Sequence, residues 1–451
     1  MNSLQRNVNL VMAAVTVLAM SAVPGLAQDA APAVDKTAAT AANVDYVFNT
    51  LLFLMSGFLV MWMAAGFAML EAGLVRTKNV AMQCTKNIAL YSIAGLMFWI
   101  VGYNLMYPGD DWVVTEFIGK FMPVTMPEPG KDIANTYATG SDWFFQMVFC
   151  ATTASIVSGT LAERIKLWPF LIFVIILTGF IYPIQGSWEW GAGWLDDMGF
   201  SDFAGSTLVH STGGWAALAG ALLLGARAGK YGPNGEIHPM PGSSMPLATL
   251  GTFILWLGWF GFNGGSQLAL GSLENASAVA KIFVNTNMAA AAGVIVAILL
   301  TQVIYGKVDL TMALNGALAG LVSITAEPLM PAIWQSVVIG GVGGVIVVLT
   351  VPLLDKLRID DVVGAIPVHL FAGIWGTLIV AWTNTDVNVA VQATGVAAVG
   401  GFVFVTSFVV WALLKATIGL RPTLEEETDG LDKAEIGLEA YPEFGSGSQR
   451  I

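Results

Sequence analysis

Apolar residues are gathered along the chain into eleven long runs, separated by polar connections. Most runs reach the roughly 20 residues that an α-helix needs to cross a hydrocarbon core about 30 Å thick. The pattern therefore predicts an all-α polytopic membrane protein with eleven transmembrane helices. The predicted helices cover residues 46–74, 85–107, 142–161, 167–186, 204–226, 246–267, 277–305, 310–326, 332–354, 363–382 and 393–418.

Basic residues are concentrated in every second connection between these runs, whereas the remaining connections are mostly acidic. Cytoplasmic loops of membrane proteins carry the excess of lysine and arginine. With an odd number of spans, this predicts a multi-pass protein of the cell inner membrane with a periplasmic N-terminus and a cytoplasmic C-terminus. The basic set is Arg76, Lys78, Arg164, Lys166, Arg227, Lys230, Lys307, Lys356 and Arg358.

The first 27 residues have the pattern of a secretory signal peptide. Arg6 precedes an apolar run from Val8 to Val23, and small residues follow at Gly25 and Ala27. Residues 28–45 show no hydrophobic period and are expected to form a short, exposed periplasmic lead-in. The transmembrane domain is then 46–418, and residues 419–451 form a cytoplasmic tail.

Two of the apolar runs each contain a histidine at the same distance from an aspartate. Asp202 stands eight residues before His210, and Asp361 stands eight residues before His369. One aspartate begins its helix at the outer face and the other at the inner face, so histidines about 12 Å along both helices should meet near the middle of the membrane. We therefore predict an inverted repeat of two five-helix halves plus one extra helix.

Composition agrees with this class and excludes others. The chain is 56% hydrophobic and 11% charged, whereas about a quarter of the residues in a soluble domain are charged. The net charge of -12 argues against nucleic acid as a partner. Cys84 and Cys150 cannot build a disulfide framework or a thiolate metal site, and no metal or cofactor is expected. The chain also lacks catalytic motifs such as His-Glu-x-x-His, which argues against an enzyme.

Ionisable residues at membrane depth tend to face a bundle interior and to mark proton or substrate routes. His210 and His369 are therefore the first functional candidates. Asp202 and Asp361 also suit the capping of free helix amides, and capping is compatible with function. Trp190 fits either an interfacial aromatic belt or an indole that recruits a cation.

Phe149, Phe262 and Ser266 lie near the predicted outer ends of their helices. Phenylalanines in membrane helices mostly face lipid or fill the core, whereas a gate requires two of them to meet across a pore. The residue types alone leave both interpretations open.

Five sequence motifs follow one another in order over residues 46 to about 442. Together they resemble the ammonium transporter (Amt/Rh) family, in its bacterial Amt type. The motifs are AGFAMLEAGLVRTKN at 65–79, GTLAERI at 159–165, DFAG at 202–205 followed by His210, GWFGFN at 258–263, and the Asp360-Asp361 pair followed by His369.

The resemblance implies transport of ammonium or ammonia through a narrow hydrophobic pore. It implies that Trp190 and Ser266 recruit the external cation, assisted by Phe149, and that Asp202 supports binding near the external mouth. It further implies that Phe149 and Phe262 form the gate. The twin histidines, His210 and His369, then line the pore and take or relay a proton.

The resemblance also implies a homotrimer in the lipid bilayer and gives the acidic tail a role. Residues 419–451 resemble the family's cytoplasmic regulatory tail, where PII-type nitrogen-signalling proteins act. The alternative is a merely solvated acidic tail.

Two other function classes stay open at this point. Two imidazoles facing each other in a membrane bundle would also suit a bis-histidine haem protein of electron transfer. A sensor could bind ammonium without conducting it.

Overall fold

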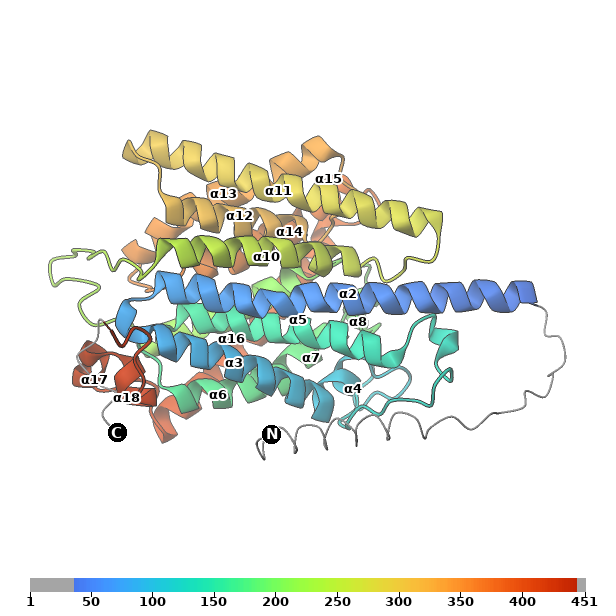
Figure 1. Cartoon of the computed structure of the whole chain (residues 1–451), viewed down its shortest axis with the longest axis horizontal. Helices are drawn as coiled ribbons and strands as arrows, with labels where there is room; N and C mark the ends of the chain where they lie inside the picture. Colours follow the sequence, from blue (N-terminus) through green and yellow to red (C-terminus); the bar gives the residue numbers. More distant parts are fainter. Residues whose placement is uncertain (1–35, 444–451) are drawn as a thin grey trace, which may run out of the picture. The chain divides into compact units, whose positions relative to one another are not determined.

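The computed structural model describes residues 36–443, so the predicted signal peptide at 1–27 and the end of the tail lie outside the described residues. The chain divides into two units after Ala42, and the architecture below is that of residues 43–443. Within that range the chain forms helices joined by loops, without a β-strand (Figure 1).

Helices occupy each of the eleven apolar runs. Most ends fall within about one helical turn of the predicted positions, and the largest differences lie at the starts of α2 and α3. The long elements are α2 (Lys36–Leu74), α3 (Val80–Met97) continued by α4 (Tyr103–Met106), α5 (Thr139–Thr160), α6 (Leu167–Ile176) continued by α7 (Tyr182–Ser187), α9 (Thr212–Leu224), α10 (Met245–Gly265), α11 (Leu273–Tyr305), α12 (Leu310–Ile324), α13 (Ile333–Lys356), α14 (Ala372–Leu378) continued by α15 (Val380–Thr383), and α16 (Val389–Thr417).

Shorter elements complete the described chain. The short α-helices are α8 (Trp194–Asp197), α17 (Leu424–Asp429) and α18 (Leu431–Ile436), and the 3-10 turns are η1 (Thr77–Asn79) and η3 (Ile133–Asn135). Four π-helical turns lie inside or at the start of long helices: η2 (Phe98–Gly102), η4 (Leu177–Ile181), η5 (Ser206–Ser211) and η6 (Ile366–Phe371).

The lead-in predicted at 28–45 is not wholly irregular, because α2 begins at Lys36. The first residues of α2 are rich in alanine, which has the highest helix propensity although it gives no hydrophobic period. The hydrophobic period therefore does not mark this first stretch of helix.

Nine helices of the described chain are long and apolar enough to cross a membrane, as expected for a polytopic membrane protein. α12 is apolar but only 15 residues long, and α5 is not among the nine. Most residues of α5 and α12 are buried inside the protein. Helices enclosed by other helices need less apolar surface than helices that face lipid, so eleven spans remains a prediction.

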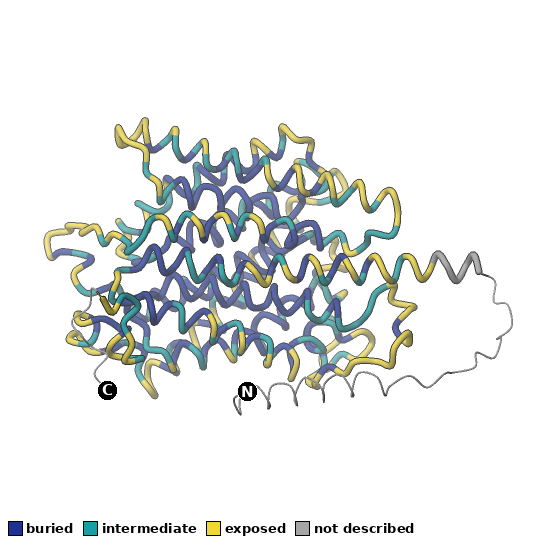
Figure 2. The backbone as a smooth tube through the Cα atoms, viewed as in Figure 1, coloured by how far each residue is buried: buried dark blue, intermediate teal, exposed yellow. Residues whose placement is uncertain are grey.

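The buried positions concentrate along the central helices, and exposed positions lie on the outer helices and loops (Figure 2). Glycines allow the closest approaches in this core. A Cβ on Gly340 of α13 would collide with the Ala289 carbonyl of α11. Small residues thus bring α11 and α13 into backbone contact, which is a common mode of helix association in membranes.

One end of the bundle is held by buried ion pairs. Arg227 contacts Asp360 at 2.9 Å and Glu163 at 3.2 Å, and Glu163 also pairs with Arg76. Burial alone would raise the pKa of Asp360. Hydrogen bonds from Arg227 and the positive charges of Arg227 and Arg164 nevertheless hold this pKa well below its ordinary value.

The tail helices α17 and α18 lie at this same end, beside the start of α3 (Figure 1). The Asp432 carboxylate accepts hydrogen bonds from the amides of Ala81 and Met82, at 3.0 and 2.7 Å. Glu427 accepts one from the Ala228 amide at 2.6 Å. The described part of the tail is therefore docked on the helix connections rather than freely solvated.

Candidate functional site

Both intramembrane histidines lie on π-helical turns, His210 on η5 and His369 on η6. The amides of Val209 and His210 both donate to the Gly205 carbonyl, at 3.1 and 3.0 Å. Gly205 itself has a φ of 104°, a backbone conformation that favours glycine. Such π turns are frequent at functional sites because they re-aim a side chain within a helix.

Asp202 fixes the start of the turn that carries His210. Its carboxylate accepts hydrogen bonds from four successive amides, those of Gly205, Ser206, Thr207 and Leu208, at 2.8–3.0 Å. The side chain is fully buried, and burial raises the pKa of Asp202 to about 6 although the four amides act to lower it.

Asp361 fixes the second turn with fewer bonds. Its carboxylate accepts from the Ile366 amide at 2.7 Å and from the Thr160 hydroxyl at 3.0 Å. The neighbouring Asp360 ties the same segment to Arg227. Both aspartates that precede the histidines thus act as caps.

The structure brings the two histidines together. Their Nδ1 atoms are 3.2 Å apart, and the ring centroids are separated by 5.2 Å at an interplanar angle of 23°. Both rings are buried, with exposed fractions of 0% and 3%. At this distance one Nδ1 donates a hydrogen bond and the other accepts it.

Aromatic rings cover the His210 side of this pair. Phe149 and Phe262 stack with centroids 3.9 Å apart at 21°, and Phe262 lies 5.2 Å from the His210 ring. Trp259 stacks on His210 at 4.8 Å and donates its Nε1 hydrogen to Thr325. The two phenylalanines predicted as a gate therefore meet directly beside the histidines.

A cavity of about 290 Å³, here called the aromatic cavity, ends at Phe149. Trp190 and Ser266 line it, together with Phe53, Phe145, Phe203 and Leu268 and five polar residues. The Trp190 indole donates to the Asp202 carbonyl at 3.0 Å, and the Ser266 hydroxyl donates to the Phe262 carbonyl at 2.9 Å. The Asp202 carboxylate faces its own helix amides rather than this cavity. Asp202 therefore acts on the cavity only by holding the Trp190 indole through its backbone carbonyl.

Sequence reasoning missed the polar part of the aromatic cavity. Asp142, a buried carboxylate, lines it with Gln146 and accepts hydrogen bonds from the Tyr103 hydroxyl at 2.5 Å and the Gln146 amide at 3.3 Å. Tyr107 and Tyr137 line it as well. The only sequence signal was Asp142 at the start of a predicted helix, where an aspartate is normally a cap.

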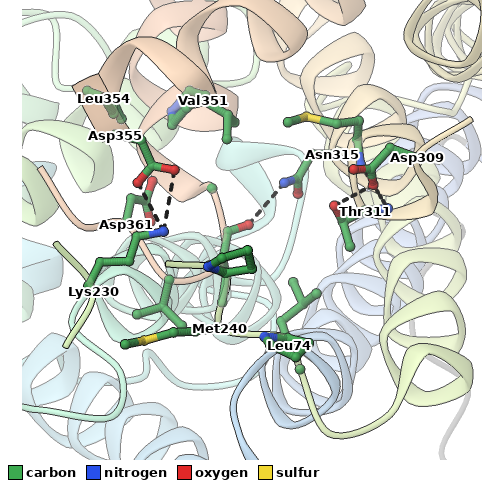
Figure 3. A pocket seen from close by; sticks show the side chains of 18 of the residues that line it. Leu74, Lys230, Met240, Asp309, Thr311, Asn315, Val351, Leu354, Asp355 and Asp361 are labelled. Carbon is green, nitrogen blue, oxygen red and sulfur yellow. Dashed lines mark hydrogen bonds and ion pairs between the residues drawn. The ribbon is translucent and has the colours of Figure 1, made fainter. Parts of the chain in front are cut away.

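A second cavity of about 460 Å³ lies at the end with the ion pairs and is here called the charged cavity (Figure 3). Lys230, Asp355 and Asp361 line it, and Lys230 pairs with Asp355 at 3.1 Å. Leu74 of α2 lines this cavity and Phe53 of α2 lines the aromatic one. At about 1.5 Å per residue the two lie roughly 32 Å apart along the helix, so the cavities open at opposite ends of the bundle.

The third histidine, His238, lies in an exposed loop, where its Nδ1 is 2.7 Å from the Gly229 carbonyl. Cys84 and Cys150 are free thiols. Among the described residues no group of three or more His, Cys, Asp or Glu side chains is arranged to hold a metal ion.

The histidine pair does not fit a haem. Metal-to-nitrogen bonds are about 2 Å long, so two imidazoles on opposite sides of a porphyrin iron would hold their ligating nitrogens about 4 Å apart with the macrocycle between the rings. Here the Nδ1 atoms are 3.2 Å apart and face each other across a hydrogen bond, with the ring centroids 5.2 Å apart. No space for a macrocycle remains between them.

Comparisons with known proteins agree on one family. A model of the Ammonium Transporter Family matches residues 51–441. Ammonium transporter Amt2 of Archaeoglobus fulgidus is 42% identical over 433 residues, which is 89% of each chain. The putative ammonium transporter sll1017 of Synechocystis is 41% identical over 401 residues, which is 88% of this chain and 90% of its own.

Solved structures show the same likeness. A structure named Sensor Amt Protein superposes with a TM-score of 0.81 at 36% identity, covering 87% of this chain and 99% of the other. Mep2 of Candida albicans superposes with a TM-score of 0.76 at 27% identity, covering 89% and 92%.

Proposed function

The chain belongs to the ammonium transporter family, a family of transporters rather than enzymes, and we propose that it carries ammonium or ammonia across a lipid bilayer between the aromatic and charged cavities. One observation carries the proposal. The stacked pair Phe149 and Phe262 lies directly against the hydrogen-bonded pair His210 and His369. A buried aromatic passage with polar groups only at its centre suits a small cation that can give up a proton.

Recruitment occurs in the aromatic cavity in this proposal. The faces of Trp190 and Phe149 attract a partly desolvated cation, worth about 0.5 to 2 kcal/mol per contact. Ser266 offers a hydroxyl oxygen, and the Asp142 carboxylate adds negative potential to the same cavity. Asp202 acts indirectly, because its carbonyl holds the Trp190 indole.

Selection occurs where the passage narrows. Potassium and ammonium are similar in size, so discrimination needs directional hydrogen bonds and the ability to lose a proton, which a metal ion lacks. A full charge at the bilayer centre costs several kcal/mol. We therefore propose that Phe149 and Phe262 gate the passage, that ammonium is deprotonated beside His210, and that the histidine pair takes or relays the proton.

The architecture around the pore completes the proposal. Eleven spans with an inverted repeat of two five-helix halves plus one extra helix account for the two Asp-to-His turns, η5 and η6, each of which is capped by its aspartate. The basic end with its docked tail is cytoplasmic and the aromatic cavity is periplasmic, in the cell inner membrane. Apolar side chains exposed on α2, α11 and α13 are covered by lipid and by the other subunits of a homotrimer.

The tail is the candidate site of regulation. α17 and α18 contact the start of α3 and the loop at Ala228 through buried carboxylates. A PII-type protein that bound this end could displace the tail and act on the charged cavity.

The test is an ammonium jump on proteoliposomes that hold the full-length protein, with internal pH and current read together. Ammonium or ammonia entry well above protein-free vesicles, with potassium excluded, supports the proposal. Binding of ammonium without any entry would indicate a sensor and overturn the transport proposal. An absorption spectrum of the purified protein with haem bands would overturn it as well.

A further inference from the structure

A void the size of one water molecule lies on the other side of the histidine pair. It measures about 10 Å³ and is lined by His369, Phe67 and Glu71, among others. A volume near 10 to 15 Å³ is about the minimum that holds one water molecule. His369 and Glu71 thus face a common space although they lie far apart in the sequence.

The Glu71 carboxyl group is buried and unevenly bonded. Its side chain is 1% exposed, and Oε2 accepts hydrogen bonds from Gln83 at 2.7 Å, Asn87 at 2.8 Å and Ser158 at 2.8 Å. Oε1 has no hydrogen-bond partner. A carboxylate oxygen without a hydrogen bond in a protein interior is destabilising. Its presence here therefore suggests that Oε1 has a function.

The free oxygen lies on the side of the void. A Cβ built on Gly159 would come within 3.4 Å of Glu71 Oε1, and Gly159 is one of the residues that line the void. A proton or a water molecule in that space is therefore placed between His369 and an oxygen with a vacant acceptor site.

A buried cation balances this carboxylate. Lys86 is fully buried and donates to Gln83 Oε1 at 2.8 Å and to the Ser158 carbonyl at 2.9 Å. Gln83 and Ser158 are the same residues that donate to Glu71 Oε2. The two charges are thus joined through shared partners, which lowers the cost of keeping Glu71 ionised.

The void also adjoins the charged cavity. Asn315 and Val363 line both spaces, and Asn315 donates to the Val363 carbonyl at 3.1 Å. The order of groups is therefore His210, His369, the void with Glu71, and then the charged cavity.

We propose that Glu71 is the group that accepts the proton from the histidine pair and releases it into the charged cavity. This inference rests on the proposed function. The N–H bond of ammonium breaks with its electron pair left on nitrogen, so ammonia continues as a neutral molecule. The proton makes one imidazole of the pair an imidazolium, which then gives a proton through the void to Glu71 Oε1. The carboxyl group loses that proton to water in the charged cavity and becomes a carboxylate again.

The test compares the parent with Glu71→Gln in full-length form in proteoliposomes given ammonium chloride. Glutamine keeps the size and the oxygen acceptor but cannot take up the proton. The parent moves a proton with each ammonia and gives a current with little internal alkalinisation. The current of the variant should be at least about tenfold lower than that of the parent. Ammonia should still enter, so that the vesicle interior becomes alkaline.

Two further variants make the result decisive. Glu327→Gln removes another buried carboxylate, one that binds the Met330 amide away from the passage, and should keep the parental current. Glu71→Asp keeps the charge but withdraws the oxygen by one methylene, and should lose current severalfold with the same alkalinisation. It tests the proposal even where the glutamine variant fails to fold.

Several outcomes would overturn the inference. Parental current in Glu71→Gln or Glu71→Asp would do so. A matched loss of current and ammonia entry would make Glu71 a structural residue. A parent that takes up ammonia without any current would end the inference and leave the transport proposal intact, whereas a parent that moves neither would end the transport proposal itself.

Discussion

The turns that carry His210 and His369 are built from the same pattern, yet they are fixed and surrounded differently. The η5 turn is capped by four amide bonds to Asp202, and its histidine is covered by Trp259 and Phe262. The η6 turn has one amide bond to Asp361 and an ion pair through Asp360. Its histidine borders a void shared with a carboxylate.

The two sides of the histidine pair differ in the chemistry for which they are suited. The His210 side is apolar and aromatic, which suits the entry of a cation and the exclusion of water. The His369 side leads to ionisable groups and to the charged cavity, which suits the departure of a proton. In the proposed mechanism the two histidines therefore have unequal roles, and substitutions should affect the two sides unequally.

The largest effect is expected at the ion pairs behind η6. Arg227→Met leaves Asp360 and Glu163 buried without their common partner, and such a loss costs about 3 to 5 kcal/mol. The yield of folded protein and its thermal midpoint in detergent should fall sharply. Lys120→Met, which removes an exposed pair with Asp111, should change neither. An Arg227→Met protein as stable as the parent would show that η6 does not depend on this anchor.

The next effect concerns the two phenylalanines on the His210 side. Phe262 stacks on both Phe149 and His210, whereas Phe149 stacks on Phe262 and borders the aromatic cavity. Phe262→Ala should therefore lower ammonium entry about tenfold and admit potassium, and Phe149→Ala should lower it only severalfold. Equal losses, measured as initial rates in vesicles, would contradict this ranking.

A smaller effect is expected in the aromatic cavity itself. Loss of a cation contact worth about 0.5 to 2 kcal/mol raises the half-saturating ammonium concentration about 2- to 30-fold. Trp190→Leu should show this rise, and Ser266→Ala, which removes a hydroxyl contact rather than a ring face, should also raise the half-saturating concentration, each with little change in maximal rate. Trp194→Leu, at the same end but outside the cavity, is the matched control. Unchanged concentration dependence in both variants would reduce Trp190 and Ser266 to packing residues.

The last expected effect is a pH dependence of stability. Burial raises the pKa of Asp202 to about 6, above its unfolded value near 3.8. The folded state therefore binds more protons between about pH 4 and 6, and the contribution of Asp202 to stability falls as pH rises through that window. Asp202→Asn should flatten this part of the profile of thermal midpoint against pH, whereas Asp197→Asn, an exposed change, should not. Parallel profiles for Asp202→Asn and the parent would contradict the pKa assignment.

Much of the helical layout was predictable from sequence, because long apolar runs leave little choice of structure. The exceptions have physical causes. The enclosed helices α5 and α12 can be less apolar or shorter than helices that face lipid. Length and hydropathy alone therefore do not identify them as membrane spans. The alanine-rich start of α2 has helix propensity without a hydrophobic period.

The candidate site was predictable where local spacing decided the geometry. Equal Asp-to-His spacing indicated that His210 and His369 would approach each other. Sequence suggested that Asp202 caps free amides, but it could not reveal that four amides would occupy the carboxylate, because that depends on the π turn. Nor could it reveal Asp142 in the aromatic cavity, which needs Tyr103 from another helix.

The histidine pair itself provides the most direct test of the account. His210→Ala and His369→Ala should each give a folded, membrane-inserted protein, since the loss of a neutral imidazole leaves no buried charge unpaired. Ammonium entry into vesicles should fall at least about tenfold in each, or potassium should enter, because the remaining imidazole loses its partner at 3.2 Å. A correctly assembled double alanine variant that carried ammonium at the parental rate and still excluded potassium would contradict the central claim.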